Sequence, residues 1–174
     1  MALAVCLMFD ARGDHAVRQL WQHLEDVGVP TLLSHTHGRH VPHLSYAVLR
    51  TYDLEKVVDT LGLLPDEGPM TLHFDALGMF RRSRTWLVPA VTSDIAARQE
   101  RVVQAVESTG ADLHRHYRPG VWVPHCTLTP RTRLDQLTTV ASAVYDVLPI
   151  VATVDHAVLI DTSTGAQYPL ENLP

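Results

Sequence analysis

The sequence has 174 residues, of which 46% are hydrophobic and 19% are charged, and its formal net charge at pH 7 is -5. This length suits a single globular domain over residues 1–174, and the hydrophobic content argues against extensive disorder. The net negative charge disfavours broad binding to a nucleic-acid backbone, which needs a concentrated basic surface, but it is compatible with a small or terminal phosphate ligand.

The first apolar run, residues 2–9, is predicted to be a strand. It is too short to cross a bilayer, no basic segment precedes it, and it leads directly into Asp10. We therefore predict a cytoplasmic protein that does not enter a membrane. Cys6 in this run and Cys126 in a later apolar run are expected to be small buried hydrophobic residues and not disulfide partners.

Apolar residues recur at helical spacing in some segments and fill short extended runs in others, so both helices and strands are predicted. In chain order the predicted elements are a strand over 2–9, a helix over 10–27, a strand over 41–49, a helix over 53–62, strands over 70–80 and 85–91, a helix over 93–109, a strand over 121–128, a helix over 134–148, a strand over 150–160 and a short strand near Tyr168. The paired runs over 70–80 and 85–91 flank a basic turn, which predicts an antiparallel hairpin. Antiparallel pairing favours an α+β architecture over a doubly wound parallel sheet.

A short motif occurs twice in the chain. The run V-P-H-L-S at residues 41–45 is echoed by V-P-H-C-T at residues 123–127. Among the eleven histidines, a single His-x-Ser/Thr is expected by chance about once or twice at ordinary residue usage. Two copies in the same Val-Pro frame indicate an internal duplication, although each copy alone is compatible with an ordinary half-solvated strand face.

The chemistry of this pair follows from strand periodicity, which places His43 and Ser45 on one face and does the same for His125 and Thr127. If a pseudo-twofold arrangement brings the two strands together, two imidazoles flank one phosphorus while two hydroxyls donate to its oxygens. An ordinary imidazole pKa of about 6.5 suits both proton acceptance and proton donation near neutrality. This scheme needs neither a metal nor another cofactor.

The duplicated motif resembles that of the two-histidine (2H) phosphoesterases, in particular the bacterial 2'-5' RNA ligase-like branch. The resemblance covers most of the chain and includes L-G-M-F at residues 77–80, followed by basic residues. It implies an α+β, bilobal domain with pseudo-twofold duplicated antiparallel sheets, outer helices and a central cleft. The first strand departs from the family pattern because it lacks the basic residue often found near its start.

The resemblance also implies an activity, which is the opening of 2',3'-cyclic phosphates or 2'-5' phosphodiester linkages in nucleotides or short RNA ends. It makes His43 and His125 the acid/base pair, with Ser45 and Thr127 holding the phosphate. Opening of a 2',3'-cyclic phosphate to a 2'-phosphate favours His125 as the base. No obligate protein partner is inferred.

Substrate contacts are predicted where an aromatic ring or a cation lies near the motifs, because a base needs a stacking surface and a phosphate needs a positive charge. The candidates are Phe80, Arg81, Arg82, Tyr117 and Arg131. A solvated surface loop is an equally valid reading of the segment that contains Tyr117. Trp21 and Trp86 are expected in the core, given their apolar neighbours.

Two other functions are compatible with these residues. A non-catalytic nucleotide-binding module could use the same fold, since a fold alone does not establish turnover. A histidine-rich metal-binding protein could use His35, His37 and His40, because imidazoles at this spacing can share a cation. No cysteine or acidic residue completes that set within the run, so we expect a loop beside the cleft instead.

Overall fold

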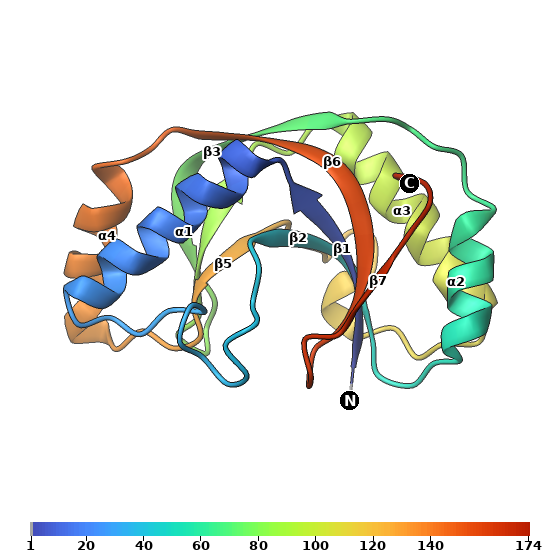
Figure 1. Ribbon diagram of the computed structural model, residues 1–174, viewed down its shortest axis with the longest axis horizontal. Helices are drawn as coiled ribbons and strands as arrows, with labels where there is room; N and C mark the ends of the chain where they lie inside the picture. Colours follow the sequence, from blue (N-terminus) through green and yellow to red (C-terminus); the bar gives the residue numbers. More distant parts are fainter. Residues whose placement is uncertain (1) are drawn as a thin grey trace.

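The computed structural model describes residues 2–174 and has an α+β fold, as predicted (Figure 1). Its helices are α1 (Ala11–Asp26), α2 (Leu54–Gly62), α3 (Ser93–Ser108) and α4 (Leu137–Tyr145). Its strands are β1 (Leu3–Phe9), β2 (His43–Leu49), β3 (Met70–Met79), β4 (Thr85–Pro89), β5 (Cys126–Thr129), β6 (Ile150–Asp161) and β7 (Gln167–Pro169). Two single turns of 3₁₀ helix, η1 (Arg115–Tyr117) and η2 (Leu134–Gln136), precede β5 and α4.

The strands form one antiparallel sheet in the order β2-β1-β6-β3-β4-β5, and β7 pairs with β6 on the edge opposite β1, beyond the residues that pair with β3. The two predicted lobes are the two halves of this sheet, and the motif strands β2 and β5 stand at its opposite ends. Figure 1 shows α1 and α4 on one flank of the molecule and α2 and α3 on the other, with β2 and β5 between them. The strongly curved sheet therefore brings together two segments that are distant in sequence.

The helix starts are fixed by side chains that cap free amide groups. Asp10 accepts from the Gly13 amide at 3.0 Å, and Thr92 accepts from the Ile95 amide at 3.2 Å. Gly28, with φ 82°, ends α1 because its left-handed conformation suits a residue without a side chain. Within residues 2–174, none of the helices has the length and apolar character needed to cross a bilayer.

The first strand is buried on both faces, which explains its unbroken apolar run. Leu3, Val5, Leu7 and Phe9 join the main core, which includes Trp21 and packs beneath the helices. The alternate residues Ala4, Cys6 and Met8 lie on the other face with Val158. This second, smaller apolar cluster underlies the face that carries the motif histidines.

The predicted strand over 121–128 is wrong in its bounds, because β5 begins only at Cys126. Pro124 has no amide proton to give to a ladder, and the preceding Trp122 turns so that its Nε1–H donates to the Ser45 carbonyl at 3.0 Å. His125 therefore stands immediately before the strand, on a segment that crosses toward β2.

Candidate active site

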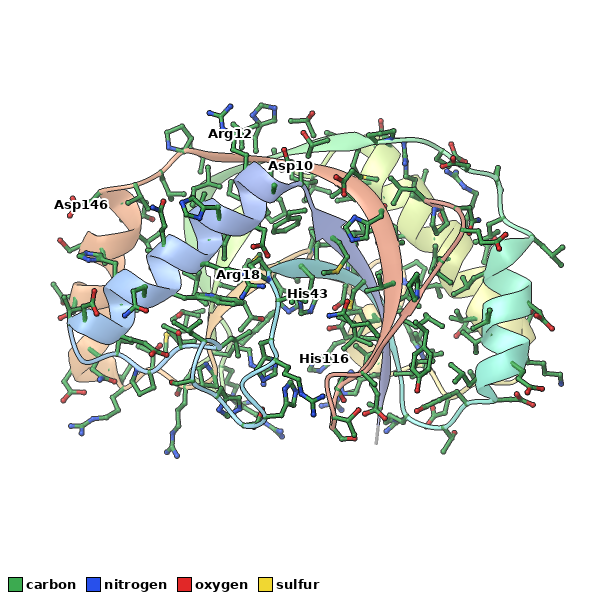
Figure 2. All side chains as sticks on the ribbon, in the orientation of Figure 1. Asp10, Arg12, Arg18, His43, His116 and Asp146 are labelled. Atoms are coloured by element: carbon green, nitrogen blue, oxygen red, sulfur yellow. The ribbon has the colours of Figure 1, made fainter. Side chains whose placement is uncertain are left out.

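The two copies of the motif contact one another between the flanks. Strands β2 and β5 contact one another, and the His43 backbone is close enough to the Cys126 thiol to oppose the rise in its pKa that burial causes. The Trp122 side chain connects the second motif segment to β2 by its hydrogen bond to the Ser45 carbonyl. Figure 2 shows His43 in the middle of the molecule, between the two helical flanks. The predicted meeting of the two motifs is therefore present.

The two imidazoles are held by the same backbone contact. Nδ1 of His43 lies 2.7 Å from the Val41 carbonyl oxygen, and Nδ1 of His125 lies 2.7 Å from the Val123 carbonyl oxygen. Since a carbonyl can only accept, Nδ1 carries the proton in both rings. Nε2 is then the nitrogen of each ring that can gain or lose a proton during a reaction. The two motifs therefore share their sequence pattern and also the tautomer of their histidine.

The surroundings of His43 favour its charged form. Burial alone would lower its pKa, but the neighbouring Cys6 side chain and the Val41 carbonyl outweigh burial and raise the pKa to about 9. Cys6 is fully buried on β1. At neutral pH the protonated form of this ring is therefore favoured.

The surroundings of His125 favour its neutral form. The ring of Phe80 lies 4.9 Å from the imidazole, edge to face, and the ring of Trp86 lies at 5.7 Å. The pKa of His125 is lowered to about 4, mainly by burial. The Val123 carbonyl opposes this change, and the nearby charges of His43 and Arg84 add to it. At neutral pH the neutral form of this ring is therefore favoured.

Trp86 is buried, as expected, but it packs beside the second motif and not among the residues of the main core. The residue is 8% exposed, yet its ring packs on Phe80, with centroids 4.9 Å apart, and on His125. Its indole lies across Gly78, where an added Cβ would come within 2.5 Å of the ring. Gly78 therefore provides the space that lets Trp86 form a wall of the site.

The two motif hydroxyls differ in their surroundings. Ser45 is 7% exposed, and its Oγ lies 3.6 Å from the Cys6 sulphur. Tyr117 on η1 lies near this serine, because η1 packs against β2, and burial raises the pKa of the Tyr117 hydroxyl to about 12. Thr127 is half-buried and pairs with Trp86 across β5 and β4. Both hydroxyls thus lie beside the histidines of their own motif.

The predicted cations Arg81, Arg82 and Arg131 are exposed, and so is Arg84, which was not predicted but whose charge acts on the site. Its charge affects the pKa of His40, His125 and Tyr117. Arg84 makes no ion pair within residues 2–174. Sequence reasoning missed it, although Arg84 stands immediately before β4 and two residues before Trp86, a spacing that in an extended chain puts two side chains on one face.

Three threonines fix the hairpin that carries Arg84 against the second motif. The hydroxyl of Thr129 lies 2.7 Å from that of Thr85 and 2.6 Å from that of Thr132. The Thr132 amide donates to the Ser83 carbonyl at 2.6 Å. All three threonines are fully buried, so this network holds the hairpin tip in place beside His125.

The loop that precedes β2 holds a cluster of imidazoles. The ring of His40 lies 4.3 Å from that of His37 and 5.8 Å from that of His35. The pKa of His40 is lowered to about 4, mainly by burial and also by the charges of His37 and His35. Across residues 2–174, no group of three or more His, Cys, Asp or Glu side chains is arranged to hold a metal ion. The His40 ring packs on the other two.

Comparisons with known proteins agree with this arrangement. A sequence model of the 2'-5' RNA ligase superfamily matches residues 13–166. Comparison with curated protein sequences finds no match. Among solved structures, a protein described as a phosphoesterase is 18% identical, with a TM-score of 0.64 and coverage of 98% of this chain and 95% of the other.

Two further structures show the same fold. Escherichia coli LigT complexed with 3'-AMP is 16% identical, with a TM-score of 0.65 and coverage of 98% of this chain and 95% of the other. The phosphodiesterase domain of MHV ns2 is 17% identical, with a TM-score of 0.53 and coverage of 76% and 81%. At these identities the likeness concerns the fold.

Proposed function

The chain belongs to the 2'-5' RNA ligase superfamily, and from this premise we propose that it is a metal-independent phosphodiesterase acting on 2',3'-cyclic phosphates or 2'-5' linkages of nucleotides or RNA ends. The observation that carries the proposal is that two imidazoles with the same backbone contact favour different protonation states. His43 has a pKa raised to about 9, and His125 has one lowered to about 4. An acid and a base are thus both ready at neutral pH.

In the proposed reaction with a 2',3'-cyclic phosphate, Nε2 of His125 takes a proton from a water molecule as its oxygen attacks phosphorus. The bond from phosphorus to the 3' oxygen breaks, and Nε2–H of His43 gives its proton to that oxygen. The product is a 2'-phosphate. His125 then loses its proton to solvent and His43 regains one, because their pKa values lie on opposite sides of neutrality.

The remaining residues are assigned to substrate binding. Arg84 supplies the cation that pairs with the non-bridging phosphate oxygens, and Thr127 and Ser45 donate hydrogen bonds to the same group. Phe80, which lies against His125, offers a ring face to a nucleoside. LigT and Usb1 have been solved with 3'-AMP and with uridine monophosphate, respectively, which supports a nucleotide as substrate.

The test is a substrate screen of the purified protein, followed by phosphorus NMR. We expect 2',3'-cyclic nucleotides or 2'-5' dinucleotides to be converted, with a 2'-phosphate as the product of the cyclic compound. Binding of these compounds without any conversion, across a range of pH, would contradict the proposal and favour a nucleotide-binding module. A 3'-phosphate product would reverse the assignment of the leaving oxygen.

A further inference from the structure

Three stretches of the chain contain no acidic residue, and they meet at the site. Residues 27–52 include the first motif, residues 113–134 include the second, and residues 76–93 include the turn between β3 and β4. The first stretch touches the second motif strand, because the Leu32 amide donates to the Leu128 carbonyl at 3.2 Å. All the acidic residues of a chain with a formal net charge of -5 thus lie outside these stretches, and the local field at the site is positive.

One face of β2 continues from the first motif to the far end of the strand. Ser45 Oγ lies 3.6 Å from the Cys6 sulphur, and Val48 packs against the small apolar cluster that contains Cys6. A bulge opposite Val5 and Cys6 inserts one residue into β2, which puts Ser45 and Val48 on the same face. We call it the motif face, and Val48 stands about 15 Å along it from His43 at the usual rise of a strand.

The segment that precedes η1 extends the motif face beyond the edge of β2. The His114 amide donates to the Val48 carbonyl at 2.8 Å. The neighbouring Leu113 bridges to Leu49, and both of these leucines belong to the main core. Since side chains alternate along an extended segment, His114 lies on the motif face.

Cationic side chains gather at this end of the motif face. The ring of His116 lies 5.0 Å from that of His114, and Arg115 Nε–H donates to His116 Nε2 at 3.2 Å. Arg115 and Arg118 are exposed, and neither makes an ion pair within residues 2–174. Figure 2 shows His116 between the two helical flanks, as it does His43. The unpaired charges are therefore on the side of the molecule that holds the catalytic pair.

A single acidic residue borders this group in the sequence. Asp112 pairs with Arg50 at 3.0 Å, and both side chains are about half exposed. An exposed ion pair of this kind contributes little to stability, so Arg50 is free to exchange the carboxylate for a phosphate. Asp112 thus weakens the positive charge of the group without cancelling it.

We propose that His114, Arg115 and Arg118 form a second phosphate-binding site, and that the substrate is therefore an RNA end of several nucleotides. This inference rests on the proposed function, which places the reacting phosphate between His43 and His125. The second site holds a phosphate further along the same chain, and arginine suits it because its guanidinium makes forked contacts with phosphate oxygens. A nucleoside cyclic phosphate has no group that reaches about 15 Å along β2.

The test compares the binding of two probes to the purified protein, an RNA tetranucleotide that ends in a 2'-phosphate and the corresponding nucleoside 2'-monophosphate. Because the tetranucleotide engages two linked sites, we expect it to bind about ten- to a hundredfold more tightly at low salt. Each phosphate neutralised in a single strand adds about 0.7 to the slope of log K against log salt concentration. The slope should therefore be steeper for the tetranucleotide, by about one unit.

The double variant Arg115→Ala/Arg118→Ala should lose about tenfold in tetranucleotide affinity and most of the additional salt slope. Arg12→Ala is the matched control, because Arg12 is also exposed and makes no ion pair within residues 2–174, but lies on α1 at the top of Figure 2, away from His116. That variant should keep the wild-type affinity. Asp112→Asn, which removes the bordering carboxylate, should bind the tetranucleotide more tightly than the wild type.

Equal affinity for the two probes, or an unchanged tetranucleotide affinity in the double variant, would overturn the proposal. Equally tight binding of a tetra-aspartate peptide would overturn the assignment to RNA. Because binding needs no turnover, tight tetranucleotide binding by a protein that converts no cyclic phosphate would refute the proposed function alone. Conversion of cyclic nucleotides with equal affinity for both probes would refute the second site alone.

Discussion

Removal of the Phe80 ring should change the pH at which the base becomes active. Phe80 covers one side of His125, with ring centroids 4.9 Å apart, and burial is the main reason that the pKa of His125 falls from 6.5 to about 4. Phe80→Ala opens this side to water while Trp86 remains. We therefore expect the pKa to rise by about one unit, which corresponds to roughly 1.4 kcal/mol.

The consequence for activity depends on pH in a definite direction. His125 acts when neutral, so kcat/KM rises as pH passes upward through its pKa. With a pKa of about 4, the neutral fraction at pH 5 is about nine-tenths, and with a pKa of about 5 it is about one half. Phe80→Ala should thus lose about twofold more kcat/KM at pH 5 than at pH 7, in addition to any uniform loss of binding.

The assay is a profile of kcat/KM against pH with a 2',3'-cyclic nucleotide, under conditions in which chemistry limits the rate. Met79→Ala is the control, because it removes an apolar side chain from the neighbouring position, on the opposite face of β3. Its acidic midpoint should match the wild type. If the midpoint of Phe80→Ala stays at or below the wild-type value, aromatic cover is not what keeps His125 neutral.

Three further predictions concern the pH limits, the cation and the metal. The wild-type profile of kcat/KM against pH should be a broad bell that rises through about pH 4 as His125 loses its proton and falls through about pH 9 as His43 loses its own. A narrow bell centred near pH 6.5 would contradict the claim that the two histidines have different pKa values. Arg84→Ala should lower kcat/KM by about ten- to a hundredfold, the range for a lost hydrogen bond to a charged group, while Arg81→Ala changes it by less than about threefold. Equal losses in these two steady-state measurements would place the phosphate elsewhere. Exhaustive treatment with a chelator should leave hydrolysis unchanged, because the imidazoles supply the proton transfers, and activity that is lost and then restored by zinc or manganese would favour His35, His37 and His40 as metal ligands.

The element order and the meeting of the two motifs could be predicted from the sequence, because both depend on local patterns. The 3.6-residue period and caps such as Asp10 and Thr92 define the helices. The repeated Val-Pro-His frame identifies His43 and His125 without any three-dimensional information. What failed locally was the start of β5, where the tertiary contact of Trp122 with Ser45 overrides an apolar run that is typical of a strand.

The different chemistry of the two histidines could not be predicted, because the groups that cause it come from other strands. Cys6 reaches His43 through the pairing of β1 with β2, and Trp86 reaches His125 through the pairing of β4 with β5. In the sequence, both residues were expected to be ordinary buried hydrophobes. Register decides such contacts, and the sequence did not reveal the register between distant strands.

The central claim is that His43 and His125 together catalyse phosphodiester opening, and steady-state turnover of His43→Ala and His125→Ala tests it most directly. With the 2',3'-cyclic nucleotide that the wild type converts fastest, each variant should retain the wild-type fold by circular dichroism and lose about two to four orders of magnitude in kcat. Ser45→Ala and Thr127→Ala, which each remove one hydrogen bond and no proton-transfer group, should lose less. Full activity in either folded histidine variant would contradict the account.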